Sequence, residues 1–203
     1  MPSKSTPSKT GPGKPTQESS KTSDSPQSWW RVHRQEISFL AIFLLVLGGG
    51  FTLLSLNSVN DGFVEPFTAQ VAKASGFTLK LIGQDIKMQG TAIFGPRFSV
   101  NIRNGCNGLE TMTIFLAAVL AFPSSWRSRV MGLVLGAVAI QIVNLIRVVA
   151  LYLTGAYFPA FFDSSHTVIW QTIVILFGVL LWIFWAQRFA ETVPVPSVET
   201  VTE

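Results

Sequence analysis

With 203 residues the chain has the length of a single domain, but 48% of its residues are hydrophobic and only 13% are charged. This balance suits a lipid bilayer better than water and excludes an ordinary soluble domain. The formal net charge of +4 does not indicate a nucleic-acid partner, because the basic residues gather in the N-terminal segment and in polar stretches beside apolar runs.

The N-terminal segment, residues 1–28, consists mainly of Ser, Thr, Pro, Lys and Gly. Such a composition cannot bury enough surface to offset its chain entropy, so we expect a disordered tail. Aromatic and basic residues from Trp29 to Arg34 then predict contact with lipid headgroups. Residues 29–190 are expected to form one membrane-embedded domain, followed by a second tail at residues 191–203.

Four apolar stretches predict four membrane helices, at about residues 37–56, 105–123, 130–153 and 167–186. The second stretch is short, so its helix spans the bilayer only if it includes the polar turn that begins at residue 105. Basic residues lie in the N-terminal tail, between the second and third helices, and after the fourth. The positive-inside rule therefore places both termini in the cytoplasm.

The outer segment, residues 57–104, contains the alternating sequence FTLKLIGQDIKMQG and the glycine-bounded run FSVNIRNG. Both patterns predict short β-strands, which would form a small sheet above the helices. The expected fold class is an all-α polytopic membrane protein with about four helices and a small β segment on the outer side, between the first two helices.

Cys106 is the chain's one cysteine, so it cannot form an intramolecular disulfide. A lone cysteine can be a small apolar filler. The predicted topology, however, places it at the outer start of the second helix. Arg147 lies ~9 Å below the outer end of the third helix, and His166 opens the fourth. An arginine in the apolar sequence VNLIRVVALYL is costly unless it faces a polar cavity, which favours a functional site.

These three residue types suit acyl transfer through a thioester. A thiol is a strong nucleophile only as thiolate, which nearby His or Arg and a helix N-terminus favour. His166 would take the thiol proton and return it to the leaving amine. Arg147 would stabilise the oxyanion of the tetrahedral intermediate.

Four polar residues are candidates for supporting roles. Asn144 lies on the same helical face as Arg147 and could hold its guanidinium. Glu110, four residues after Cys106, would share its helix face and could pair with Arg147, Arg103 or His166. Asn107, the residue after the cysteine, and Arg103, three residues before it, complete the predicted site.

The sequences NGCNGLETMTIFLAAVLAFP, VNLIRVVALYLTG and DSSHTVIWQ resemble the Cys, Asn-x-x-Arg and His motifs of the exosortase and archaeosortase family, particularly its short exosortase H group. The resemblance covers about residues 37–188 and is most specific over 104–171. It departs from the larger exosortases, which have about eight membrane helices.

The resemblance implies a cysteine peptidase of the bacterial inner membrane that acts as a transpeptidase, with its active site facing the periplasm. Its substrates would be exported proteins with a C-terminal sorting signal: a short motif, a membrane helix and a basic tail. Cys106 would be the nucleophile, Arg147 the oxyanion or positioning residue and His166 the acid/base. Exported proteins and the lipid bilayer are the expected partners, and no cofactor is indicated.

Alternatives are weighed on residue types. An aspartic signal peptidase needs two facing carboxylates at the membrane surface, and Asp163 has no evident second partner. A zinc protease would need a His-Glu-x-x-His motif, which is absent from the sequence, so no metal site is expected. A non-enzymatic membrane scaffold, in which Arg147 and Glu110 pair to hold the helices, stays open, whereas one polar stripe is weak support for a channel or carrier.

Overall fold

A computed structural model describes residues 33–190 of the chain. The two predicted tails, residues 1–28 and 191–203, lie outside the described residues. Within these bounds the protein is mostly helical, with one small sheet.

Among residues 33–190 three helices are long and apolar enough to cross a membrane: α2 (Arg34–Ser55), α6 (Trp126–Tyr157) and α8 (Trp170–Arg188). A fourth apolar helix, α5 (Leu109–Ala121), is shorter. The chain is therefore a polytopic membrane protein. Four apolar helices are present as expected, with shifted ends, and α6 is longer at both ends. The second was predicted to span by including the polar turn from residue 105, but α5 begins four residues later and its 13 residues are too short to span alone.

The ends of α5 and α6 follow from local chemistry. Phe122 adopts an extended conformation after α5, which is the preference of a residue that precedes a proline, here Pro123. Ser125 then caps α6, because its hydroxyl accepts a hydrogen bond from the Ser128 backbone N–H at 3.4 Å.

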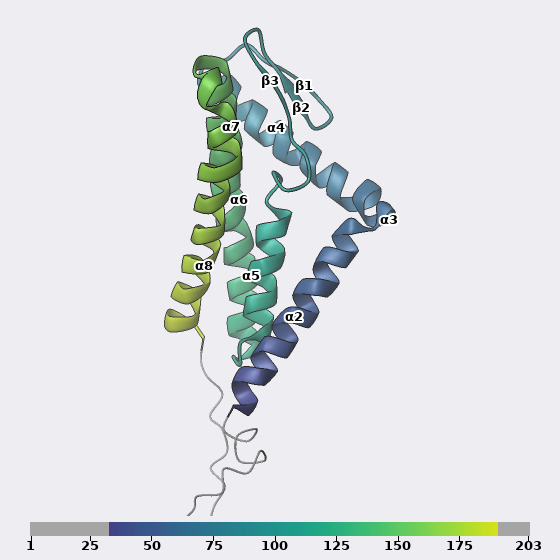
Figure 1. Cartoon of the computed structure of the whole chain (residues 1–203), viewed down its shortest axis with the longest axis vertical. Coiled ribbons are helices and arrows are strands. Elements are labelled where there is room, and N and C mark those ends of the chain that lie inside the picture. Colours follow the sequence, from purple (N-terminus) through teal and green to yellow (C-terminus); the bar gives the residue numbers. More distant parts are fainter. Residues whose placement is uncertain (1–32, 191–203) are drawn as a thin grey trace, which may run out of the picture. The chain divides into compact units, whose positions relative to one another are not determined.

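The outer segment contains both helix and sheet (Figure 1). After the short helices α3 (Asn57–Val59) and η1 (Asn60–Val64) comes α4 (Glu65–Leu81). The strands β1 (Lys87–Gln89), β2 (Ala92–Phe94) and β3 (Ser99–Asn101) form an antiparallel sheet in the order β1-β2-β3.

The predicted small sheet is confirmed, but only the end of FTLKLIGQDIKMQG forms a strand, because its first part, FTLKL, belongs to α4. Buried positions of α4 recur at helical spacing, so this face packs on the core while the opposite face is exposed. Within FTLKL one apolar residue, Leu79, faces the core, whereas Phe77 and Leu81 are exposed.

Two hydrophobic clusters hold the described fold together. One joins α4, the sheet and the C-terminal part of α6, with Leu79, Ile93 and Tyr152 almost completely buried. The other joins α5, α6 and α8 around Phe115 and Trp185. The outer segment is therefore packed against α6 as a cap, not suspended as a loop.

The cap meets a part of α6 that extends beyond the thickness of a bilayer. Its 32 residues measure ~48 Å, against ~30 Å of hydrocarbon. Arg147 lies ~32 Å along the axis from Trp126 and ~15 Å below Tyr157. If α6 enters the hydrocarbon near Trp126, Arg147 lies at the opposite boundary of the hydrocarbon.

The connection from α6 to α8 contains three short helical segments: η2 (Pro159–Phe161), α7 (Phe162–Ser164) and η3 (Ser165–Ile169). The last is a single π-helical turn that carries His166. Such turns are rare and occur frequently at functional sites.

Candidate active site

The loop between β3 and α5 holds Cys106 between two glycines of positive φ. Gly105 has φ +88° and Gly108 has φ +82°, values that glycine adopts without the steric cost of a side chain. A side chain at Gly108 would also press on Gln141 and Asn144 of α6. The glycines thus let the loop turn tightly and approach α6.

Cys106 precedes α5 and is not part of its first turn, so the prediction of a helical Cys106 is wrong. Its backbone N–H donates to the Arg103 carbonyl at 2.9 Å, which closes a turn. Glu110 therefore does not share a helix face with Cys106.

Asn107 fixes this loop from three sides, and its side chain is 1% exposed. Its amide donates to the Thr68 hydroxyl of α4 at 2.9 Å, and its side-chain oxygen accepts from the Leu109 backbone N–H at 3.1 Å. Its carbonyl accepts from the Gln141 amide of α6 at 3.3 Å. Asn107 is thus a structural anchor between the cap, α5 and α6.

The three residues singled out for chemistry lie together. The Cys106 Sγ lies 3.1 Å from the His166 Nε2. The Arg147 Nη2 lies 3.7 Å from the same sulfur, and its Nη1 donates to the Gly105 carbonyl at 3.4 Å. Residues from a loop, α6 and η3 therefore converge on one thiol.

Aromatic rings hold the imidazole of His166. Phe162 stacks on it with the planes 11° apart and the centroids at 5.8 Å. Phe98, in the turn between β2 and β3, packs against Phe162 at 4.9 Å and against Tyr152 of α6 at 6.1 Å. The cap thus contacts the candidate base through two rings.

Arg147 and Asn144 are buried, at 3% and 0% exposure, one turn apart on α6. The expected bond between them is not observed: the side-chain oxygen and nitrogen of Asn144 and the Nε of Arg147 have no hydrogen-bond partner within the described residues. Such unpaired groups cost stability and are unusual in native proteins, so this stretch of α6 is not optimised for stability.

The expected pairing of Glu110 is also absent among residues 33–190, where the Arg147 side chain forms hydrogen bonds only with Gly105 and Cys106. The Glu110 carboxylate instead lies beside Gly105, half-buried. Arg103 is exposed and lines a polar pocket on the cap side.

Cys106 lies outside the spanning helices, and burial raises the pKa of its thiol above the ordinary value. The Arg147 charge lowers this pKa, and the Glu110 charge raises it, but burial has the largest effect. The sequence predicted that neighbouring groups favour the thiolate, but the raised pKa favours the protonated thiol. A base must therefore take the proton.

Thr68, Phe98 and Phe162 were not singled out from the sequence. Only Phe162 gave a signal, because it precedes His166 by four residues, the spacing of helical neighbours. In the described part of the chain no three His, Cys, Asp or Glu side chains lie close enough to hold a metal ion.

The fold and the site define a class: a polytopic membrane protein with a Cys, Arg and His cluster at one end of its helices. A family model described as "Transmembrane exosortase (Exosortase_EpsH)" matches residues 27–186. The chain belongs to this family, as the sequence motifs indicated. No curated protein and no solved structure matches the chain.

Proposed function

We propose that the protein is a membrane-embedded cysteine peptidase or transpeptidase that cleaves C-terminal sorting signals of exported proteins. The observation that carries this proposal is the convergence of Arg147 and His166 on the Cys106 thiol, at 3.7 and 3.1 Å. A nucleophile within hydrogen-bond reach of a base, with a cation beside the nucleophile, is an arrangement suited to covalent acyl transfer.

In the first step His166 takes the thiol proton, because the raised pKa of Cys106 leaves the thiol protonated at rest. The Cys106 sulfur attacks the scissile carbonyl carbon and forms a C–S bond. Arg147 stabilises the charge on the carbonyl oxygen. The C–N bond then breaks, and His166 gives its proton to the amine of the departing C-terminal fragment.

In the second step a nucleophile resolves the Cys106 thioester. His166, now neutral, takes a proton from water or an amine, whose attack forms the new bond to carbon. The sulfur leaves and recovers its proton from His166. Water would make the protein a hydrolase, and an amine would make it a transpeptidase.

The family and the polytopic fold support work at a membrane. We place the protein in the inner membrane with Cys106 on the periplasmic side, because the basic residues cluster near the opposite helix ends. The departing fragment would carry the membrane helix and basic tail, and the retained acyl group would be the exported domain.

The test uses an exported protein from the same genome that ends in a polar motif, an apolar helix and a basic tail, coexpressed with this chain. Wild type should release it from the membrane and form a hydroxylamine-sensitive adduct on Cys106. Cys106→Ser should abolish both, while Lys73→Gln, an exposed change on α4, should not. Unchanged release by Cys106→Ser would refute the enzyme and favour a scaffold.

A second measurement tests the orientation. Because Cys106 is the chain's one thiol, a membrane-impermeant maleimide reports on that site alone. Labelling in intact spheroplasts is expected, and labelling only after the membrane is opened would contradict a periplasmic active site.

A further inference from the structure

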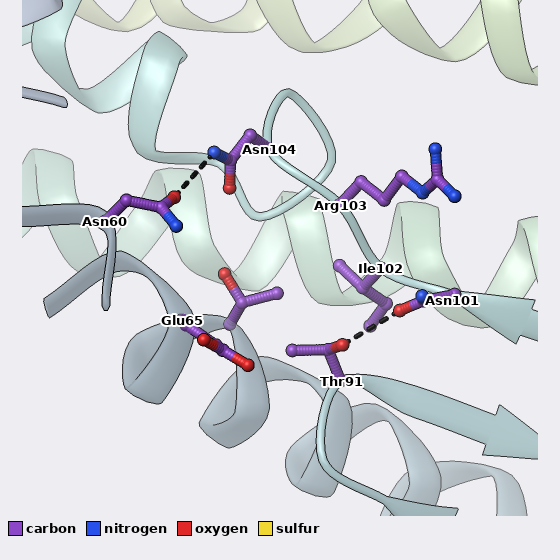
Figure 2. Close-up of a pocket in the computed structure, with 8 residues that line it drawn as sticks. Asn60, Glu65, Thr91, Asn101, Ile102, Arg103 and Asn104 are labelled. Carbon is purple, nitrogen blue, oxygen red and sulfur yellow. Dashed lines mark hydrogen bonds between the residues drawn. The ribbon is translucent and has the colours of Figure 1, made fainter. Parts of the chain in front are cut away.

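A polar pocket of about 430 Å³ lies between α4, the sheet and the loop that leads to Cys106 (Figure 2). Its lining includes amide, hydroxyl, carboxylate and guanidinium groups. The catalytic cluster uses none of them directly, and the hydrophobic packing of the cap does not need them.

Two asparagines of this pocket are held so that complementary groups stay free. The Asn104 amide nitrogen donates to the Asn60 side-chain oxygen at 2.9 Å, which leaves the Asn104 oxygen as a free acceptor. The Asn101 oxygen accepts from the Thr91 hydroxyl at 2.8 Å, which leaves the Asn101 nitrogen as a free donor. An extended peptide backbone offers the matching N–H and C=O groups.

Two unpaired charges stand on opposite sides of the same pocket, as Figure 2 shows for Glu65 and Arg103. Within the described residues neither side chain has a hydrogen bond or an ion pair. Guanidinium groups bind carboxylates with short, charge-assisted hydrogen bonds. The Arg103 side of the pocket therefore suits an acidic side chain, and the Glu65 side suits a hydrogen-bond donor.

The pocket is close to the nucleophile. Arg103 and Cys106 are the first and last residues of a hydrogen-bonded turn, so their Cα atoms are within ~7 Å of each other. Thr68 of the pocket wall bonds Asn107, the residue after the cysteine. A peptide that covers ~7–10 Å contains two to three residues.

We infer that this pocket binds the two to three residues that precede the scissile bond, as an extended peptide with an acidic side chain against Arg103. It lies on the cap, outside the spanning helices, so it receives the acyl part of the substrate and not its membrane helix. This inference rests on the proposed function and adds the residues that select the substrate.

The first test measures steady-state release of the substrate whose processing depends on Cys106, by purified enzyme in liposomes. Arg103→Gln and Asn101→Leu should each raise KM about tenfold and leave kcat nearly unchanged, because they remove contacts to bound substrate without touching the thiol. The matched control is Gln89→Leu, on the strand at the other edge of the sheet. An unchanged KM, or a loss confined to kcat, overturns the proposal.

A double-mutant cycle tests the acidic side chain. Changing the substrate's Asp or Glu near the cleavage site to its amide should raise KM for wild type but add nothing for Arg103→Gln. Additive effects would mean that Arg103 does not contact that side chain.

If Arg103→Gln or Asn101→Leu fails to accumulate, a crosslinking experiment tests whether the pocket binds the substrate. Benzophenone-alanine in place of Thr91, in a Cys106→Ser background, should crosslink to the residues just before the scissile bond. Crosslinks only to the membrane helix of the substrate, or none, overturn the pocket assignment. The proposed function fails separately, if release does not require Cys106 at all.

Discussion

Helices α2 and α6 are both apolar enough to cross a membrane, but they differ in how many of their residues are buried and how closely they pack. α2 has no buried residue, and an apolar pocket of about 250 Å³ lies between it, α5 and α8. α6 has ten buried residues, including Asn144 and Arg147. The most apolar of the three long helices, α2, contributes little to packing, whereas α6, which carries buried polar groups, forms the centre of the bundle.

This difference separates two demands on the sequence. Insertion into the membrane needs only apolar length, which α2 supplies. The proposed site needs a cation held in a fixed position, and α6 holds Arg147 by close packing at a cost in stability, because polar groups of this stretch are unpaired within the described residues. Unpaired polar groups at a functional site are the usual place for such a cost.

The largest expected effect comes from Arg147. Replacing it with Gln should reduce substrate release ~10²–10³-fold, the range seen when an oxyanion donor is removed. Replacing the exposed Leu45 of α2 with Ala should leave release within twofold. Release rates of purified variants in liposomes measure this, and a mild effect of Arg147→Gln would show that another group stabilises the oxyanion.

The second prediction compares how closely α6 and α2 pack against their neighbours. A side chain at Gly136 of α6 would overlap the Phe115 ring of α5, whereas one at Gly49 of α2 would meet nothing within 4 Å. Gly136→Val should therefore destabilise the protein by ~1–3 kcal/mol, as overpacked cores do. Gly49→Val should be within ~0.5 kcal/mol, as is usual for surface substitutions. Unfolding in detergent compares the two, and equal losses would contradict the loose packing of α2.

The substitution Asn144→Leu is expected to change stability and activity in opposite directions. Asn144→Leu removes two unpaired buried polar atoms at similar size, so it should raise stability by ~1 kcal/mol. If the amide is retained for the site, release should fall at the same time. The same detergent melts and release assays give both values, and a loss of stability would mean that the amide has a partner in the membrane.

The smallest effect concerns pH. The negative charge of Glu110 raises the pKa of the Cys106 thiol, so Glu110→Gln should lower that pKa. The rate at which iodoacetamide alkylates Cys106 rises as the thiol ionises, so the midpoint of that rise should move to lower pH, by only part of the total shift, since burial is its larger cause. A pH profile of the alkylation rate for both proteins shows the direction, and movement to higher pH would reverse the assigned role of Glu110.

The spanning helices were predictable because hydropathy and length suffice for them. Helix α4 was missed although its buried Thr68, Val71, Ala72, Ser75, Gly76 and Leu79 recur at helical spacing. Four of these six residues are small or polar, so the face does not read as apolar. Only the close approach of the sheet, with Met88 packed over Gly76, makes such residues suitable for a core.

The proximity of Cys106, Arg147 and His166 was predictable from their residue types and their predicted depth in the membrane. The loop around Cys106 was not, because its shape depends on two glycines in the left-handed region and on hydrogen bonds of Asn107 to α4 and α6. The contact of Phe98 with Phe162 joins residues 64 positions apart, and no local sequence pattern predicts it.

The length of α6 has a further consequence. If α6 enters the hydrocarbon near Trp126, its rigid length, with Arg147 ~32 Å from its first residue, sets the height of the thiol relative to the membrane. A substrate anchored by its own helix in the same bilayer would then present its cleavage site at one distance only. Lengthening the spacer between motif and helix by a few residues would carry the bond past the thiol.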